Sequence, residues 1–192
     1  ARAEQHRVLN AMLVLCAEHE LNASSFTARC AASAGASPYA TVNAGMCALR
    51  GPKHAGATLA VEELLEAVAK SGDATAVVTH YLAQGRSVPG FGHRVYRDLD
   101  PRAAILFEMI ESLPGGSKEM RRVSQLIHTM ALGTGLKANL DLALVACSRA
   151  LGAPASTSLH IFCLARVAGF IAHTIEQYQD GRLLRPRAEF ER

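Results

Sequence analysis

The chain has 192 residues, of which 49% are hydrophobic and 19% are charged. This balance excludes an intrinsically disordered chain, and the length suits one domain or two small ones. The formal net charge of +3 is too small to indicate nucleic-acid binding, although a local cluster of arginines could still bind an anionic small molecule. No run of 18 apolar residues occurs, so we expect no membrane-spanning helix.

The composition favours helices over strands. Aromatic residues make up only 5%, Trp is absent and there are 34 alanines. Alanine loses no side-chain freedom in a helix, whereas aromatic residues favour strands. We therefore expect an all-α fold. The pattern predicts helices over residues 4–18, 24–35, 39–49, 59–70, 75–84, 103–113, 118–132, 142–151 and 157–178.

Local start and stop signals separate these helices. The first has an apolar stripe that includes Val8 and Met12, and the second is built of small residues, so we expect it to be buried. Pro38 opens the third, which stops at Gly51-Pro52. Asn139 and Asp141 lie at the start of the helix over 142–151.

Two regions fall outside the helical pattern. Residues 88–93 are rich in turn formers, and only Arg94–Tyr96 shows a trace of strand alternation. Residues 180–192 form a polar tail rich in arginine, which ordinarily indicates a solvated basic patch. Asp100-Pro101 marks the start of the helix between these two regions.

The cysteines predict a reducing environment. Their number is odd and no CxxC pair occurs, so we expect free, buried thiols. The first residues show no signal-peptide pattern, and the chain is expected to be cytoplasmic. It begins without Met, as a fragment would. The cysteines are Cys16, Cys30, Cys47, Cys147 and Cys163.

Three of the eight histidines stand out by position. His19, His54 and His93 each lie at a helix edge or a Gly/Pro break, where backbone donors are free and a ligand can come close. The other five lie within helical patterns typical of surface or hydrogen-bonded core residues. No metal-ligand spacing links these histidines, so no metal site is expected.

An aspartate and an arginine are further candidates. Asp141 could be a plain helix N-cap, or a general base whose charge is favoured by the helix N-terminus and opposed by burial. Arg166 lies inside an apolar helix, and a buried guanidinium needs an anionic partner from the protein or from a ligand.

Several motifs follow one another along the chain. They are His19-Glu20-Leu21-Asn22-Ala23-Ser24, Gly51-Pro52-Lys53-His54, Gly90-Phe91-Gly92-His93-Arg94-Val95-Tyr96, Asp100-Pro101-Arg102, Asn139-Leu140-Asp141, Ala165-Arg166-Val167-Ala168-Gly169 and Arg185-Pro186-Arg187-Ala188-Glu189. Read together, they resemble the motifs of the citrate synthase family, over nearly the whole chain from about His19 to the end.

The resemblance implies condensation of acetyl-CoA with oxaloacetate, followed by thioester hydrolysis to citrate and CoA. Asp141 would remove the methyl proton, His54 would donate to the thioester oxygen, and His93 would polarise the ketone. The resemblance also gives a substrate-binding set and a set that faces coenzyme A. The first is His19, Arg102, Arg166 and, from the neighbouring subunit, Arg185; the second is Val88, Pro89, Gly90, Phe91, Gly92 and Arg97.

The implied architecture has two helical lobes. Residues 1–57 and 163–192 would belong to a large lobe, and residues 58–162 to a small lobe that closes over the substrates. The CoA thioester is a substrate, and no tightly bound cofactor or metal is implied. The expected partners are the two substrates and either a second copy of the chain or a chain that supplies a further N-terminal half, without nucleic acid or membrane.

The sequence also departs from the family pattern. Family members usually carry a long additional N-terminal region, roughly doubling the chain. Ala55 stands where Gly is common, Lys53 where Leu is common and Phe170 where Trp is common. Since Ala55 adds a methyl group beside His54, 2-methylcitrate synthase, which uses propionyl-CoA, is an alternative. A catalytically silent acyl-CoA or dicarboxylate binder is another.

Overall fold

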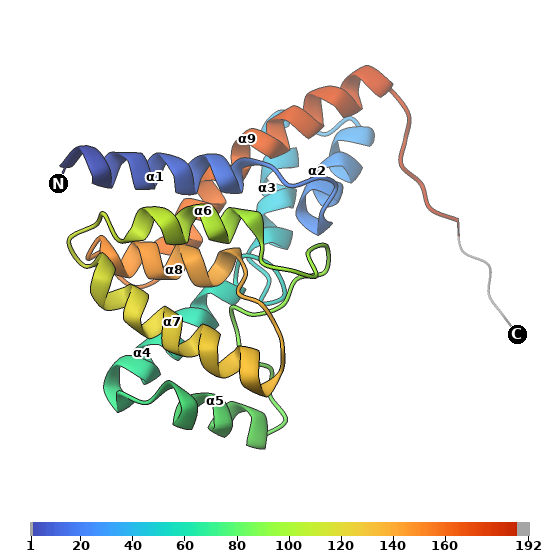
Figure 1. Ribbon diagram of the computed structural model, residues 1–192. Helices are drawn as coiled ribbons and strands as arrows, with labels where there is room; N and C mark the ends of the chain where they lie inside the picture. Colours follow the sequence, from blue (N-terminus) through green and yellow to red (C-terminus); the bar gives the residue numbers. More distant parts are fainter. Residues whose placement is uncertain (1, 188–192) are drawn as a thin grey trace, which may run out of the picture.

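The computed structural model describes residues 2–187 and confirms the all-α class (Figure 1). Within these residues no strand forms, and a single antiparallel bridge joins Phe91 to Ala138. The helices are α1 (Arg2–Ala17), α2 (Ala23–Ser33), α3 (Pro38–Leu49), α4 (Ala57–Ser71), α5 (Ala74–Ala83), α6 (Pro101–Ile110), α7 (Gly116–Gly133), α8 (Leu140–Ala150) and α9 (Thr157–Asp180).

Side-chain caps explain why most boundaries lie within a few residues of the prediction. The carboxylate of Asp73 accepts from Ala76 N, and that of Asp100 accepts from Arg102 N ahead of Pro101. Asn139 accepts from two backbone amides at the start of α8. The trace of strand predicted at Arg94–Tyr96 is wrong, because two backbone amides of this segment donate to the His93 ring instead of to a neighbouring strand.

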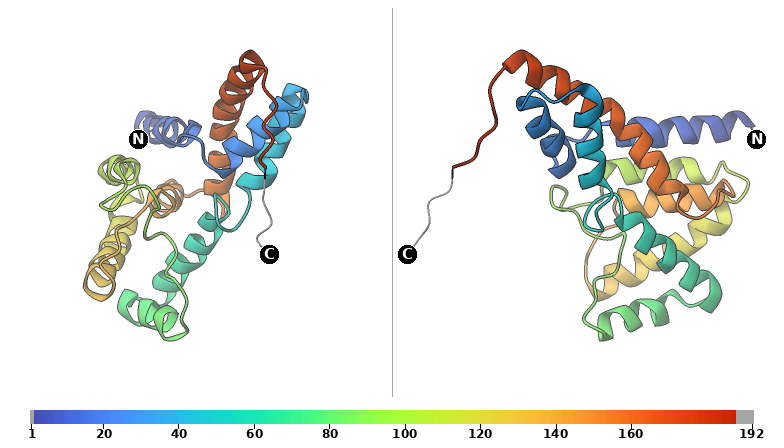
Figure 2. Two further views of the ribbon diagram at one scale, coloured as in Figure 1. Left: turned by 90° about the vertical axis from the view of Figure 1, so that its right-hand side faces the viewer. Right: turned by 180° about the vertical axis from the view of Figure 1, so that it is seen from behind.

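The helices pack in two groups that α9 connects (Figures 1 and 2). Helices α2 and α3 pack against each other and against α9, while α6 and α8 form a pair flanked by α4 and α7. Helix α1 contacts both groups through α9 and α6. At one crossing Gly169 lies so near the Ala17 carbonyl that a Cβ would come within 2.4 Å. The lobe boundary expected at residue 163 falls inside the continuous helix α9.

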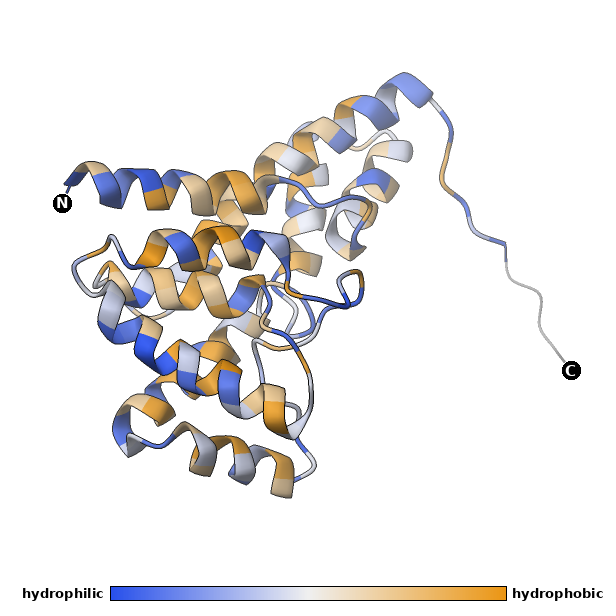
Figure 3. Ribbon diagram, viewed as in Figure 1, coloured by the Kyte–Doolittle hydropathy of each residue, from blue (hydrophilic) through white to orange (hydrophobic). Residues whose placement is uncertain are grey.

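Helix α8 lies at the centre of the core. Nearly all of its residues are buried, and it appears mostly hydrophobic in Figure 3, whereas the outer helix α7 alternates between hydrophilic and hydrophobic residues. In α7 the buried side chains Val123, Leu126 and Met130 recur at helical spacing. Since α8 is fixed on several sides, whatever its first turn presents is held rigidly.

Helix α9 is the one described helix that is long and apolar enough, by length and composition, to cross a membrane. It also contains the buried polar residues Arg166, Thr174 and Gln177, and it packs against α1, α2 and α3. This burial pattern is that of a core helix, for which the length criterion alone is weak evidence of a membrane span.

The cysteine prediction is only partly correct. All five thiols are free, and Cys16, Cys147 and Cys163 are buried. Cys30 is half-buried, however, and Cys47 is exposed. The expectation of a buried thiol is wrong at Cys47, because this residue lies on the outward face of α3, opposite the buried residues Thr41, Gly45 and Leu49.

Candidate active site

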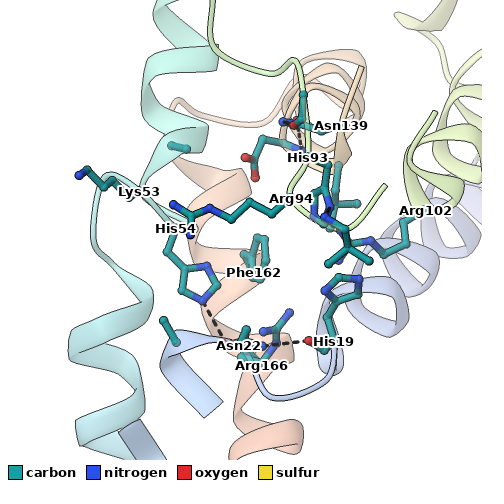
Figure 4. A pocket seen from close by; sticks show the side chains of 16 residues that line it. His19, Asn22, Lys53, His54, His93, Arg94, Arg102, Asn139, Phe162 and Arg166 are labelled. Atoms are coloured by element: carbon teal, nitrogen blue, oxygen red, sulfur yellow. Dashed lines mark hydrogen bonds between the residues drawn. The ribbon is translucent and has the colours of Figure 1, made fainter. Parts of the chain in front are cut away.

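A cavity of about 650 Å³ lies where the starts of α2, α6 and α8 meet the turn before α4, the loop after α5 and the middle of α9 (Figure 4). This volume is typical of a small-molecule site. The lining contains four Lys and Arg side chains but one carboxylate. The lining residues are His19, Asn22, Ala23, Lys53, His54, Ala57, Gly92, His93, Arg94, Val95, Arg102, Asn139, Leu140, Asp141, Phe162 and Arg166.

Asn139 joins two walls of the cavity. Its side-chain oxygen accepts from the backbone amides of Asp141 and Leu142, and its amide nitrogen donates to Gly92 O at 2.9 Å. Gly90 O accepts from Asn139 N, and Gly90 has a φ of 85°, in the left-handed region that favours glycine. One residue therefore caps α8 and fixes the loop that carries His93.

The backbone selects the tautomer of His93. Its Nδ1 accepts from Val95 N at 3.0 Å and Tyr96 N at 3.2 Å, so the proton of the neutral ring lies on Nε2. That Nε2 lies 3.3 Å from Arg102 Nη2, which is also a donor. Two donors this close together favour an acceptor oxygen beside them that can accept from both. Burial is the main reason why the pKa of His93 lies below its ordinary value.

Arg102 is held by the buried Asp100. The guanidinium donates from Nε to Oδ1 at 3.0 Å and from Nη2 to Oδ2 at 2.9 Å. The same carboxylate accepts from Leu140 N at the start of α8. Burial raises the pKa of Asp100, but the hydrogen bonds and charge of Arg102 outweigh it, and the pKa lies below its ordinary value. Arg102 is thus oriented before any ligand arrives.

His19 lies in the strained turn that precedes α2. Glu20 has a φ of 54°, and the adjacent His19 Nε2 is 2.9 Å from Tyr96 Oη. The His19 ring meets the His93 ring edge to face, with centroids 5.6 Å apart. Burial, then the charge of Arg102, keeps the pKa of His19 below its ordinary value, so that the ring is neutral near pH 7.

His54 lies on the opposite wall as a neutral ring. Its Nε2 contacts Ser24 Oγ at 2.9 Å and Asn22 Oδ1 at 3.3 Å, and Figure 4 shows the ring turned toward Asn22. Burial, reinforced by the charge of Arg166, lowers the pKa of His54 to about 4. With Nε2 engaged in this way, Nδ1 is the ring nitrogen left for a ligand among the contacts of the described residues.

Asp141 combines a helix N-terminus with burial. Because Asn139 is the N-cap of α8, Asp141 is not the plain cap that one interpretation allowed. Its carboxyl group has no hydrogen bond to any residue between 2 and 187. Burial raises its pKa to about 7, although the charge of Arg102 opposes this shift and Asp100 adds to it. A carboxylate with this pKa is basic enough to accept a proton from carbon near neutral pH.

Arg166 has the anion-seeking character expected of a buried arginine. It is 1% exposed, its Nε donates to Cys16 O at 2.7 Å, and its Nη1 is buried without a hydrogen-bond partner. The Phe162 ring lies 5.1 Å from the guanidinium. Since no protein carboxylate satisfies Arg166 within the described chain, a bound anion is the partner that this geometry favours.

The other residues predicted to bind ligands lie outside this cavity, except Gly92. The side chains of Val88 and Phe91 are buried in the core, and Gly90 packs against Leu142. Pro89 lies beside them, half-buried. Arg97 lines an adjoining cavity of about 210 Å³, which shares Gly92 and His93 with the main one. Arg185 is exposed in the segment after α9 and does not reach the cavity of its own chain.

Several lining residues were not predicted as site residues. Asn22 and Arg94 belong to the motifs quoted above, and their polarity beside His19 and His93 is a signal that could have identified them. Phe162 gave no such signal, since it is one apolar residue of a helix. Ala55, by contrast, is fully buried and absent from the cavity lining, so its methyl group does not narrow the site.

Metal ligation finds no support in this site. No group of three His, Cys, Asp or Glu side chains within residues 2–187 is placed to hold an ion. The site instead offers a basic carboxylate, neutral imidazoles, three arginines and a lysine. This set suits proton transfer next to an anionic substrate.

Comparison with known proteins identifies relatives over most of the chain. The family model for citrate synthase, C-terminal domain, matches residues 1–187. The chain is 36% identical to the 2-methylcitrate synthase of Shewanella oneidensis, over 96% of the chain and 50% of that protein. It thus spans about half the length of the curated relatives it matches.

Two solved structures show the same fold. Citryl-CoA lyase from Hydrogenobacter thermophilus superposes with a TM-score of 0.86 at 28% identity, covering 97% of this chain and 74% of that one. The Thermoplasma acidophilum citrate synthase, in a ternary complex with carboxymethyl coenzyme A and oxaloacetate, superposes with a TM-score of 0.85 at 29% identity, covering 98% of this chain and 54% of that one. With a family model matching almost its whole length, the chain belongs to the citrate synthase family.

Proposed function

We propose that this chain carries the catalytic residues for condensing an acyl-CoA with oxaloacetate to a tricarboxylate and CoA. The observation that supports this most strongly is that one cavity brings together Asp141, His54 and His93 with two arginines. Each group is in the state the reaction needs: a carboxylate with a pKa of about 7, a neutral donor and an Nε2–H donor.

The arginines suit the dicarboxylate. Oxaloacetate has two carboxylates flanking a ketone, and a guanidinium binds a carboxylate through paired hydrogen bonds. Arg102 is pre-oriented by Asp100, and Arg166 has a buried nitrogen without a partner. Between them, the Nε2–H of His93 would donate to the ketone oxygen, and His19 would complete the set. This binding fixes the ketone carbon for attack.

Proton removal from the acyl group is the difficult step. A thioester α-carbon is a weak acid, so its enolate must be stabilised as it forms. Asp141 would take the proton while the Nδ1–H of His54 donates to the thioester oxygen, in the tautomer whose Nε2 accepts from the Ser24 hydroxyl. Loss of one such pre-positioned donor typically costs about 10²–10³ in rate. The lowered pKa of His54 keeps its ring neutral at pH 7, so that the ring stabilises the enolate by a hydrogen bond and not by a positive charge.

Bond formation and hydrolysis then follow with balanced charges. The enol carbon attacks the ketone carbon, and His93 supplies the proton that the new alkoxide takes up. Water next adds to the thioester carbon and the carbon–sulfur bond breaks. Of the two protons of water and the one held by Asp141, one goes to the departing thiolate to give CoA, one returns to His93, and one leaves to solvent. A tricarboxylate remains in the cavity.

Propionyl-CoA is the second candidate donor. The relative from Shewanella oneidensis is named a 2-methylcitrate synthase, and the cavity wall near His54 has the small side chains Ala23 and Ala57. An additional methyl group is worth only about 1–3 kcal/mol of discrimination in an apolar pocket. The two donors should therefore differ in kcat/KM by a modest factor.

A partner is part of the proposal. Arg185 is exposed and remote from the cavity of its own chain, as an arginine donated to a neighbouring subunit would be. Either a second copy or a chain supplying the other half of the relatives' length would complete the substrate clamp. We also propose that the two lobes, with Gly/Pro breaks at 51–56 and 152–154, close over the substrates.

The decisive assay is release of free thiol from acetyl-CoA and from propionyl-CoA with and without oxaloacetate. A synthase releases CoA only when oxaloacetate is present, and the faster thioester identifies the donor. A catalytically silent binder would instead show ligand-dependent thermal stabilisation without thiol release. The absence of both responses would refute the proposal.

A further inference from the structure

The cavity contains more positive charge than a dicarboxylate needs. Two lining arginines, Arg102 and Arg166, are already assigned to the two carboxylates of oxaloacetate, and Arg185 of a neighbouring subunit would complete that clamp. Arg94 and Lys53 also line it, and neither forms an ion pair or a side-chain hydrogen bond with any residue between 2 and 187. Unneutralised cations on the wall of one cavity favour a further anion.

The position of Arg94 indicates where that anion would lie. Arg94 follows His93 in the loop that Asn139 fixes, and its side chain extends across the cavity toward the wall of His54 and Lys53 (Figure 4). Arg102 and Arg166 lie on the other side, near His19 and Phe162. The cavity thus has one cationic region for the dicarboxylate and a second beside the proposed thioester donor.

We propose that Arg94 forms a third carboxylate subsite, beside His54, that binds the carboxylate released by thioester hydrolysis. This inference rests on the proposed function. A thioester carbonyl is uncharged, so it does not call for a guanidinium. When water replaces the sulfur, the same carbon becomes a carboxylate with a full negative charge next to His54. Arg94 would then bind it, and the site would hold tricarboxylates more tightly than dicarboxylates.

Lys53 contributes charge on the same side without being required for the subsite. Lys53 and Arg94 are both exposed, but Figure 4 shows the Lys53 side chain directed away from the His54 ring, at the rim, whereas that of Arg94 extends toward it. A lysine is a point charge, whereas the planar guanidinium of Arg94 can engage both oxygens of a carboxylate. The proposal therefore assigns the directional contacts to Arg94.

The test compares two stable ligands, citrate and malate, by calorimetric titration of the 192-residue chain. Malate is citrate without one carboxymethyl arm, so their difference reports the third carboxylate. In Arg94→Gln, citrate binding should weaken about 10- to 100-fold, the range for one charged hydrogen-bonded contact, while malate binding changes less than about twofold. Arg94→Lys should recover part of the loss.

A matched control separates a specific contact from loss of net charge. Arg121 is exposed on α7 and does not line the cavity, so Arg121→Gln removes the same charge and should leave citrate binding unchanged. Lys53→Leu should weaken citrate binding less than Arg94→Gln does.

Each failure has its own meaning. Equal citrate binding in the wild type and Arg94→Gln would overturn the subsite and leave the proposed function standing. Weakened binding of CoA, measured with desulfo-CoA, together with unchanged citrate binding would overturn it in favour of a phosphate contact. No binding of either citrate or malate to the wild type, assembled as a dimer or with the chain that supplies the other half of the relatives' length, would overturn both the subsite and the proposed function.

Discussion

The two walls of the cavity differ in how completely their polar groups are bonded. On the wall formed by the starts of α6 and α8, the Asp100 carboxylate accepts from Arg102 and from Leu140 N. The Asn139 side chain donates to Gly92 O. On the wall formed by α2 and α9, Arg166 lines the cavity and its Nη1 is buried without a partner. The first wall is preorganised within the protein, and the second leaves a donor available for a ligand.

The largest expected effect is at Asp141, whose carboxyl group has no hydrogen bond to any residue between 2 and 187 and binds no carboxylate of the substrate. Asp141→Asn keeps the shape of the side chain but removes the base, so turnover should fall about 10²–10⁴-fold. Malate binding should change little, because Asp141 does not serve the carboxylates. Thiol release and calorimetry measure the two quantities. Unchanged turnover in this variant would exclude Asp141 from the mechanism.

Removing an anchor of the bonded wall should cost stability. Asp100→Ala leaves the Arg102 guanidinium and the Leu140 amide without their acceptor. Breaking a buried ion pair from one side typically costs about 3–5 kcal/mol. Urea unfolding measures this loss. A matched control, Asp73→Ala, removes an exposed helix cap and should cost only about 1 kcal/mol.

The unbonded wall should behave in the opposite way. Arg166→Met removes a buried charge that lacks a carboxylate partner, so the unfolding free energy without ligand should not fall by the several kcal/mol expected at Asp100. Malate binding should nevertheless weaken about 10- to 100-fold. A large loss of stability without a change in malate affinity would show that Arg166 is structural.

The pH dependence should separate activity from stability. Since the pKa of Asp141 is about 7, kcat/KM should fall about tenfold for each pH unit below 7. Its ordinary value is 3.8, so between pH 4 and 7 the folded chain holds a proton that the unfolded chain has lost. The contribution of Asp141 to stability therefore decreases as pH rises through this window.

His54 contributes with the opposite sign. Its pKa is lowered from 6.5 to about 4, so its contribution to stability increases as pH rises between these values. Urea unfolding of Asp141→Asn and the wild type across pH 4–7 isolates the aspartate. The stability difference between the two proteins should change across this range, and a constant difference would contradict the assigned pKa.

The smallest expected effect concerns the residue that joins the loop to α8. Asn139→Ala removes the cap of the helix and the bond to Gly92 O, at a typical cost of about 1 kcal/mol. Asn139→Asp keeps the cap but loses the donor to Gly92. If the bond to Gly92 positions His93, Asn139→Asp should unfold with nearly the wild-type free energy but turn over more slowly than the wild type.

The helices could be predicted because their signals are local. Asp100-Pro101, Asn139 and Pro38 each mark a helix start within a few residues, and the position of Arg166 in an apolar helix predicted its burial. The tautomer of His93 could not be predicted, because it depends on backbone amides of a loop with no regular structure. The place of Phe162 in the cavity wall could not be predicted either, because it depends on which face of α9 meets the cavity.

The central claim is that Asp141 removes a proton from the acyl carbon, and solvent exchange tests it directly. Acetyl-CoA is incubated with the chain in D₂O, with malate occupying the dicarboxylate site, and the methyl signal is followed by NMR. The account predicts loss of the methyl proton signal with the wild type and its retention with Asp141→Asn. Equal exchange by the two proteins, or none by the wild type, would contradict it.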